Sequence, residues 1–312
     1  MSTLSVLITY HNEKDLLKEC LQSLVSQDQG PDEVLIYDDA SKYPATDYLI
    51  SDSRIRVIRG EKNEGPSFGR NVLLAEAKGD YIHYHDSDDW FASDWAKQIR
   101  RAIGFRHADA IFTEVKSYKS GGEVHSEHVL GLQNVTDHHS LIKFCIRRFM
   151  LVPAGTYKLR FVRNHGGYRT ELWQSEDYEF NVRMALNLEI FELIPEPLVA
   201  IRLREESRSR NKVETNTYAL EAVTLLKSET PRTYWKDLSE KAATIGRELF
   251  ALGEIGTARR AFKVAKTLGP PKFIDEGPFY RMIARSLGQE AAEKTGQIYR
   301  HYSPLNVRRW LR

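Results

Sequence analysis

The stretch "HYHDSDDW", from His83 to Trp90, places two histidines and three aspartates within eight residues. Imidazole and carboxylate groups are the side chains that most often bind divalent metal ions in proteins. Two metal chemistries therefore suit this stretch. Zinc would use the histidines, whereas a harder ion would use the carboxylates.

A zinc site of the hydrolase type H-x-H-x-D-H would take His83 and His85 as ligands. The same pattern requires Asp at position 87 and His at position 88, where this chain has Ser87 and Asp88. Alternation along a strand also puts both histidines on the face of Tyr81, which is typical of half-buried strand residues. The sequence therefore disfavours zinc.

The aspartates Asp86, Asp88 and Asp89 offer hard oxygen ligands instead. Mg²⁺ or Mn²⁺ bound there would keep part of its water shell and neutralise the charge of a substrate diphosphate. A D-x-D triplet also arises by chance, and an exposed acidic loop is the alternative. The position of the triplet after a predicted buried strand favours the functional interpretation.

The first 120 residues alternate strand and helix patterns. "LSVLITY", from Leu4 to Tyr10, is typical of a strand buried on both faces, and Asn12 can cap the helix that follows it. Further strands are predicted over 33–39, 54–60 and 80–86, with a helix over 67–77. This β-α-β order predicts a mostly parallel sheet, and "YDDAS" and "HDSDD" both fall at carboxyl ends of its strands.

The alternation weakens after residue 120. We expect a helix over 137–148, a β-like segment over 156–164, and a helix that opens at "SEDYEF". From residue 211 the pattern is helical, with one helix-turn-helix unit in "AATIGRELFALGEIGTARRAFKVAKTLGP". The predicted organisation is a domain over 1–210, in two halves of 1–120 and 121–210, followed by a helical extension over 211–312.

Composition limits the class of protein. The chain has 312 residues, of which 41% are hydrophobic, enough to build a globular core. No run approaches the roughly 18 apolar residues of a membrane span, and no signal peptide is recognisable, so we expect a cytoplasmic protein. The two cysteines, Cys20 and Cys145, exclude a disulfide framework and are expected to be packing residues.

Charge is distributed unevenly along the chain. Residues 202–312 contain 22 Lys and Arg against 13 Asp and Glu, whereas residues 1–201 contain 23 against 30. The basic C-terminal region, which ends in "YRHYSPLNVRRWLR", suits peripheral contact with an anionic membrane surface at the inner face of the membrane. A solvated helical face is the alternative, and we expect no nucleic-acid partner.

The order of these motifs resembles that of the family 2 glycosyltransferases, from about Leu4 to Ser207. Four segments match in order: "VLITYHNE" with "YDDAS", "NEGPSFGRN", "HYHDSDDW", and "HGGYRTELWQSEDYEFNVRMA". The resemblance implies the GT-A fold of nucleotide-diphospho-sugar transferases. It also implies an inverting enzyme that moves a sugar from a UDP-type donor to a saccharide or lipid-linked saccharide acceptor in bacterial polysaccharide or glycolipid synthesis.

By this resemblance the first segment binds the nucleotide. Thr9, Tyr10 and Glu13 would lie in the nucleotide loop, and Asp39 would accept a hydrogen bond from the N3–H of a uracil-type base. Asp38 is expected only to cap the following turn. The chain departs from the family here, because many members have Pro-Thr-Tyr-Asn where this sequence has "TYHN".

The second segment would bind the donor phosphates. Asn63 and Gly65 belong to the family's loop, Ser67 is expected to cap the helix, and Arg70 would clamp a diphosphate at the helix N-terminus. The alternative for Arg70 is a surface arginine that pairs with a nearby glutamate.

The third segment would hold the metal. Asp86 would lie near the donor ribose, and Asp88 would ligate the Mg²⁺ or Mn²⁺ that bridges the two phosphates. In "IRLREES" many members have a histidine where this chain has Arg204. Arginine cannot ligate a metal, but it can give the leaving diphosphate a fixed positive charge, which implies weaker metal dependence.

The fourth segment would bind the acceptor. Asp177 corresponds to the general base of inverting members, and Trp173 is placed to stack on an acceptor sugar. A carboxylate at a helix N-terminus is stabilised as the anion, so Glu176 and a buried pocket would have to raise the pKa of Asp177. The alternative is that both acids are ordinary first-turn residues.

A different class of function also accounts for the departures at Thr9 and Arg204. The chain would then be a catalytically impaired binding or scaffolding module with the same GT-A fold. The acids at positions 39, 86, 88 and 177 are all present, which favours the enzyme. A nucleotidyltransferase would need a Gly-rich phosphate loop near the N-terminus, where this chain has "LITYHNEKD".

Overall fold

The structure is a computed structural model that describes residues 2–119, 122–204, 210–270 and 278–302. Ser207 and the tail from Ser303 onward, both considered above, lie outside these residues. The chain forms two compact units, Met1–Arg210 and Asn211–Arg312.

In the described part of the first unit, nine strands form one sheet in the order β3-β2-β1-β4-β8-β6-β9-β5, with β7 paired to β6. Strands β1 to β4 run parallel, as does β9 beside β6, whereas β8, β7 and β5 are antiparallel to their neighbours. The strands are β1 (Leu4–Tyr10), β2 (Glu33–Asp38), β3 (Ile55–Arg59), β4 (Tyr81–Asp86), β5 (Trp90–Phe91), β6 (Ala110–Lys119), β7 (Val124–Ser126), β8 (Gly155–Lys158) and β9 (Phe191–Leu203).

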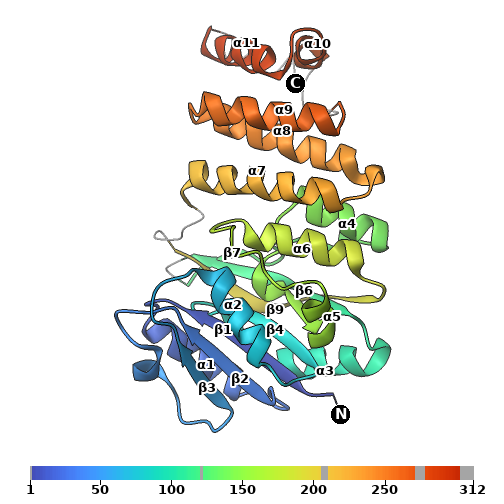
Figure 1. The fold of residues 1–312 in the computed structure, drawn as a ribbon. Coiled ribbons are helices and arrows are strands. Elements are labelled where there is room, and N and C mark those ends of the chain that lie inside the picture. The colour runs from blue at the N-terminus through green and yellow to red at the C-terminus, as the bar shows by residue number, and fades with distance from the viewer. Residues whose placement is uncertain (1, 120–121, 205–209, 271–277, 303–312) are drawn as a thin grey trace. The chain divides into compact units, whose positions relative to one another are not determined.

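Helices cover both faces of this sheet (Figure 1). They are α1 (Asp15–Val25), α2 (Pro66–Glu76), α3 (Trp95–Arg106), α4 (His138–Arg147), α5 (Leu159–Asn164) and α6 (Glu176–Asn187), with short 3₁₀ turns η1 (Ala45–Tyr48), η2 (Leu132–Asn134) and η3 (Val152–Ala154). The parallel β-α-β order predicted for the first half is confirmed. The segment 156–164 was predicted as β-like throughout, but only β8 is a strand, and α5 follows it directly.

Two predicted helix caps are wrong. Helix α1 begins after Lys14 and has no side-chain cap, while Asn12 has a positive φ of 71° and its Oδ1 accepts from the backbone N–H of Tyr43. Helix α2 begins after Gly65, and the hydroxyl of Ser67 donates to the carbonyl of Leu172. Both polar side chains therefore connect loops that are distant in sequence.

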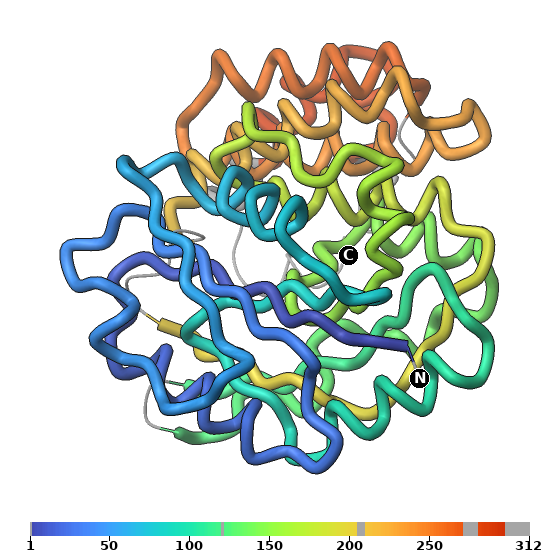
Figure 2. The backbone as a smooth tube through the Cα atoms, turned by 60° about the horizontal axis from the view of Figure 1, so that its bottom comes forward, coloured from blue at the N-terminus to red at the C-terminus, as the bar shows by residue number. Residues whose placement is uncertain are grey.

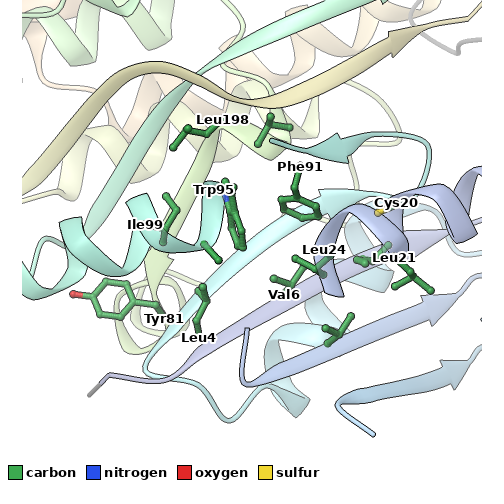
Figure 3. Close-up of a cluster of buried hydrophobic side chains, with 14 of the residues drawn as sticks. Leu4, Val6, Cys20, Leu21, Leu24, Tyr81, Phe91, Trp95, Ile99 and Leu198 are labelled. Carbon is green, nitrogen blue, oxygen red and sulfur yellow. The ribbon is translucent and has the colours of Figure 1, made fainter. Parts of the chain in front are cut away.

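The core lies between the sheet and helices α1 and α3. Figure 3 shows its side chains from β1, α1 and α3 meeting in one cluster, which includes Leu4, Val6, Leu21, Leu24, Trp95 and Ile99. Alternation turns Thr9 to the opposite face, where α2 approaches so closely that a Cβ on Gly69 would lie 2.6 Å from the Tyr37 ring. Helices α1 and α3 thus cover one face of the parallel strands, and α2 covers the other.

The two histidines of the opening stretch belong to this core. His83 and His85 are buried, His83 lies 2.9 Å from the Thr156 hydroxyl, and the His85 ring stacks on Phe91. Burial lowers the pKa of both, that of His85 to about 4, so they are neutral packing residues. Within the described ranges, no group of three or more His, Cys, Asp or Glu residues forms a metal cluster.

The second unit is helical. Its helices are α7 (Lys212–Glu229), α8 (Trp235–Ala251), α9 (Ile255–Leu268), α10 (Pro278–Ser286) and α11 (Gln289–Tyr302), with a 3₁₀ turn η5 (Arg232–Tyr234). Helices α8 and α9 pack closely, since a Cβ on Gly246 would lie 2.5 Å from the Phe262 ring. Among the helices that the structure describes, none has the length and apolar character to cross a membrane.

We predict that Ile99→Ala destabilises the first unit by about 2–5 kcal/mol, because removal of this buried side chain leaves a cavity. Phe105→Ala, in the same helix, is the control, since Phe105 is 72% exposed and its loss should change the free energy of unfolding by about 0.5 kcal/mol or less. Urea unfolding monitored by tryptophan fluorescence measures both. Equal effects of the two substitutions would contradict this packing.

Candidate active site

Parallel pairing brings the predicted site residues together at one edge of the sheet. In the register of β1 with its two neighbours, Tyr10 lies opposite Asp38, and Thr9 lies opposite Asp86. Strands β1 and β4 run side by side in the turned view of Figure 2. The carboxyl ends of β1, β2 and β4 therefore present the "YHN", "DDAS" and "DSDD" loops to the same region.

The two acids after β2 have different roles. Asp38 is a turn cap, as predicted: its oxygens accept from the N–H groups of Ser41 at 2.8 Å and Ala45 at 2.9 Å. Asp39 accepts from the N–H groups of Glu64 and Gly65, both at 2.8 Å. It thereby fixes the loop that leads into α2, and its carboxylate oxygens retain lone pairs for a further donor.

The loop after β1 differs from the sequence-based assignment at one position. Tyr10 was expected to contact the nucleotide, but its side chain is buried in the core cluster and its hydroxyl donates to the Tyr43 carbonyl at 2.7 Å. His11 takes the exposed position instead, with Nδ1 2.9 Å from the Asp39 carbonyl oxygen and Nε2 3.3 Å from Asn63. The sequence held one sign of this, because the family's Tyr corresponds to His11 and not to Tyr10.

Glu13 connects this loop to the D-x-D loop. Its Oε2 accepts from the His11 N–H at 2.5 Å and from the Ser87 hydroxyl at 3.1 Å. Thr9 is half-buried at the end of β1. Three predicted residues of the first segment, Thr9, Glu13 and Asp39, thus line the same edge. Asn63, of the second segment, contacts this group through His11.

Backbone strain is concentrated in these loops. Six non-glycine residues of the described chain have positive φ, and four of them lie in the loops of the site: Asn12, Lys14, Ala40 and Ser175. A non-glycine residue in this region costs on the order of 1 kcal/mol and persists only where surrounding contacts impose it. Ser175 directly precedes Glu176 and Asp177, so the acids at the start of α6 are presented from a strained turn.

Arg70 is the central cation of the site. Its side chain is buried, with a residue exposure of 3%, and it forms ion pairs with Asp86 at 2.9 Å and Glu176 at 2.8 Å. Its guanidinium also lies 4.9 Å from the Tyr168 ring centroid. Burial alone would lower the pKa of Arg70, but Asp86, Tyr168 and Glu176 raise it above its usual value. Arg70 is therefore permanently charged.

This arrangement gives Arg70 a structural role beside its predicted one as a phosphate clamp. Its two outer nitrogens each bind one carboxylate, so the residue bridges the D-x-D loop after β4 and the start of α6. The sequence alone did not identify this pair, because Glu176 lies 106 residues away from Arg70. Contact with a phosphate stays a prediction.

The loop before α6 is fixed to α2 by further contacts. The Asn71 side chain donates to the Tyr168 carbonyl at 2.7 Å and accepts from the Tyr168 N–H at 2.8 Å. Trp173 is 38% exposed and packs on Gly65, where a Cβ would lie 2.9 Å from its ring. Trp173, which is predicted to stack on an acceptor sugar, thus lies beside the loop that Asp39 fixes.

Asp177 has the electrostatics of a base that works near neutral pH. Its side chain accepts from the Tyr178 N–H at 2.7 Å. Burial, and then the neighbouring charge of Glu176, raise its pKa from 3.8 to about 7, against the lowering effects of that hydrogen bond and of Arg70. Burial and Glu176 thus raise the pKa of Asp177, which is what the sequence led us to expect of a general base at this position.

The D-x-D loop carries excess negative charge. Burial, and then the charges of Asp86 and Glu13, raise the pKa of Asp88 to about 6 against the lowering effect of Arg204. Arg204 binds Asp88 through Nη2 and Oδ2 at 2.6 Å. Asp89 is buried and accepts from the Arg202 N–H at 2.9 Å, so it is a structural residue.

The acids of the D-x-D loop could hold a divalent ion if donor phosphates and water completed its ligands. The acidic loop would gain from a cation, and Asp88 provides a carboxylate whose side chain is 18% exposed. The other ligands would have to be phosphate oxygens and water, which suits Mg²⁺ or Mn²⁺. An ion on Asp88 would also have to displace Arg204 from the same carboxylate.

The raised pKa of Asp177 predicts a pH-dependent stability. Between pH values of about 4 and 7 the folded protein binds a proton that the unfolded chain releases, so stability falls as pH rises through this range. Asparagine does not titrate. The Tm of Asp177→Asn relative to wild type should therefore increase from pH 4 to pH 7 and level off above it, as measured by calorimetry.

The exposed acid Asp28 provides the control for this experiment. The difference in Tm between Asp28→Asn and wild type should not change over the same range. A pH-independent difference for Asp177→Asn would mean that Asp177 titrates like an ordinary aspartate.

Known proteins resemble this chain in sequence. The family model described as glycosyl transferase family 2 matches residues 5–163, more than half of the 312 residues. WfaP of Escherichia coli, a UDP-Glc:alpha-D-GlcNAc-diphosphoundecaprenol beta-1,3-glucosyltransferase, is 29% identical over 147 residues, covering 46% of this chain and 57% of WfaP. The chain spans 30–57% of the length of the first curated relatives that it matches.

Solved structures share the fold over almost the whole chain. TarS 1-349 of Staphylococcus aureus, in complex with UDP-GlcNAc, has a TM-score of 0.70 and 19% identity, covering 97% of this chain and 93% of that one. The mannosyltransferase PcManGT of Pyrobaculum calidifontis, in complex with GDP-Man and Mn²⁺, has a TM-score of 0.60 and 14% identity, covering 96% and 87%. The fold is GT-A, as predicted, and with the family match it follows that the chain belongs to glycosyl transferase family 2.

Proposed function

We propose that the protein is an inverting glycosyltransferase. It moves a sugar from a nucleotide-diphosphate donor, a UDP-sugar, to a hydroxyl of a saccharide or lipid-linked saccharide acceptor in bacterial polysaccharide or glycolipid synthesis. The observation that carries this proposal is the pair of carboxylates joined through buried Arg70. Asp86, in the D-x-D loop, and Glu176, beside the raised-pKa Asp177, both bind the same guanidinium.

The donor would bind at the carboxyl edge of β1, β2 and β4. Asp39 retains acceptor capacity for a base N–H, and His11 and Asn63 form an exposed pair beside it. Asp86 would contact the donor ribose. The UDP-sugar donor is supported by the complex of TarS with UDP-GlcNAc and by the similarity to WfaP, a UDP-Glc glucosyltransferase.

The charge of the diphosphate requires positive groups beside it. Asp88 would hold Mg²⁺ or Mn²⁺, and such an ion would stabilise the negative charge that develops on the leaving diphosphate. PcManGT was solved with Mn²⁺, which supports an ion in this fold. Arg204, which binds Asp88, is the alternative source of positive charge at this place and would compete with such an ion for the carboxylate.

Asp177 would act as the general base. It removes the proton from the acceptor hydroxyl while that oxygen forms a bond to the anomeric carbon, and the bond from that carbon to the diphosphate oxygen breaks. The nucleoside diphosphate leaves with the bonding electrons. Burial and then the neighbouring Glu176, which binds Arg70, raise the pKa of Asp177 to about 7.

The acceptor would enter beside Trp173. The exposed face of this ring is apolar and flat, which suits stacking on the faces of sugar rings. The lipid-linked form of the acceptor is supported by the similarity to WfaP, which acts on a diphosphoundecaprenol-linked sugar.

The donor is tested by a thermal-shift screen of UDP-sugars and GDP-sugars, followed by a transfer assay with saccharide acceptors. We expect a UDP-sugar to raise Tm and to be turned over. If nucleotide-sugars bind but none is transferred to any acceptor, the catalytically impaired binding module replaces the enzyme as the better account.

The base is tested by Asp177→Asn. Because a general base typically contributes 10²–10⁴-fold, kcat should fall at least about 100-fold while UDP affinity stays within about twofold. In the wild type, kcat/KM should rise with pH through about 7, as Asp177 loses its proton. Asp28→Asn is the matched control, and near-normal transfer by Asp177→Asn would show that another group is the base.

A further inference from the structure

The contact between Arg204 and Asp88 is built by the sheet. Strand β9 pairs antiparallel with β5, so that Trp90 lies opposite Ala200. The buried Asp89 side chain continues this pairing by accepting from the backbone N–H of Arg202. Arg204, two residues further along, is thereby brought beside Asp88, and their 2.6 Å ion pair is a consequence of the register.

The other arginines of this region are engaged elsewhere. Arg70 binds Asp86 and Glu176, and Arg202 binds Glu19 at 2.7 Å while its guanidinium covers the Trp90 ring. The Arg204 side chain is 32% exposed, and its ion pair with Asp88 uses one outer nitrogen, Nη2. Its guanidinium therefore holds Asp88 and still has donors to offer.

A guanidinium has five N–H donors in a planar fork, so one edge can bind a carboxylate while the other binds a phosphate. A metal ion in this fold would connect the same two groups through its coordination shell. The two cations compete for the Asp88 carboxylate, because two positive charges a few Å apart repel in a partly buried site.

We propose that Arg204 takes the bridging place between Asp88 and the donor diphosphate, and that a divalent cation can enter only by displacing it. The identity of the diphosphate rests on the proposed function, whereas the competition between Arg204 and the cation does not. The protein therefore binds its nucleotide without metal. A neutral metal-ligating side chain at position 204, as in Arg204→His, makes nucleotide binding depend on the metal.

The competition is tested first without nucleotide, by titrating Mn²⁺ into the full-length protein and following the electron paramagnetic resonance signal of free Mn²⁺. Arg204→Ala and Arg204→His should bind Mn²⁺ roughly tenfold or more tightly than wild type, because a cation next to Asp88 is gone. Arg56→Ala removes one positive charge from a surface pair with Glu76 and should leave Mn²⁺ affinity unchanged. Equal Mn²⁺ affinity in wild type and both Arg204 variants would overturn the competition.

The bridge is tested by calorimetric titration of UDP with Mn²⁺ or with EDTA, on variants whose Tm shows that they are folded. The UDP Kd of wild type should change less than about threefold between the two conditions, whereas EDTA should weaken UDP binding to Arg204→His at least about tenfold. Loss of UDP binding by wild type in EDTA, or EDTA-resistant binding by Arg204→His, would overturn the bridge. Failure of every protein to bind UDP would refute the proposed donor and the bridge, while the Mn²⁺ titration would still decide the competition.

Discussion

The buried guanidinium of Arg70 is the interaction on which the site depends. It carries a positive charge between two carboxylates, and removal of one partner from such a buried network typically costs about 3–5 kcal/mol. The bridge fixes the D-x-D loop against the start of α6, so Asp86 and Glu176 are held at a set separation. Its partner Glu176 lies beside Asp177 and is the second cause, after burial, of the raised pKa of that residue.

The scaffold supports this bridge from both sides. Parallel register places the ends of β1, β2 and β4 together, and Asp39 fixes the loop that begins α2, the helix that carries Arg70. On the other side, Asn71 binds the backbone of Tyr168. Strained residues such as Ser175 persist because these contacts impose them. Arg204, which follows β9, binds Asp88 of the same D-x-D loop.

Local patterns predicted the elements, whereas distant contacts had to come from the structure. Short strand-like runs, of which the first is apolar throughout, identified β1 to β4. Their order placed "YDDAS" and "HDSDD" at one edge, because parallel strands share the direction of their carboxyl ends. The partners of Arg70 and Trp173 could not be predicted, since Glu176 and Gly65 lie about a hundred residues away in the chain. Tyr10 lies in the core because alternation along β1 turns its side chain to the same face as Ile8, and the family's Tyr corresponds to His11. The roles of the site residues in catalysis stay predictions.

The central claim is that one carboxylate, Asp177, activates the acceptor for a single direct displacement at the anomeric carbon. Proton NMR of the first product formed from an α-linked UDP-sugar tests it most directly, because the anomeric configuration records the number of displacements. The account predicts a β-linked product from the earliest time point. An α-linked product would contradict it, since retention requires a second displacement or a front-face route that Asp177 as sole base does not provide.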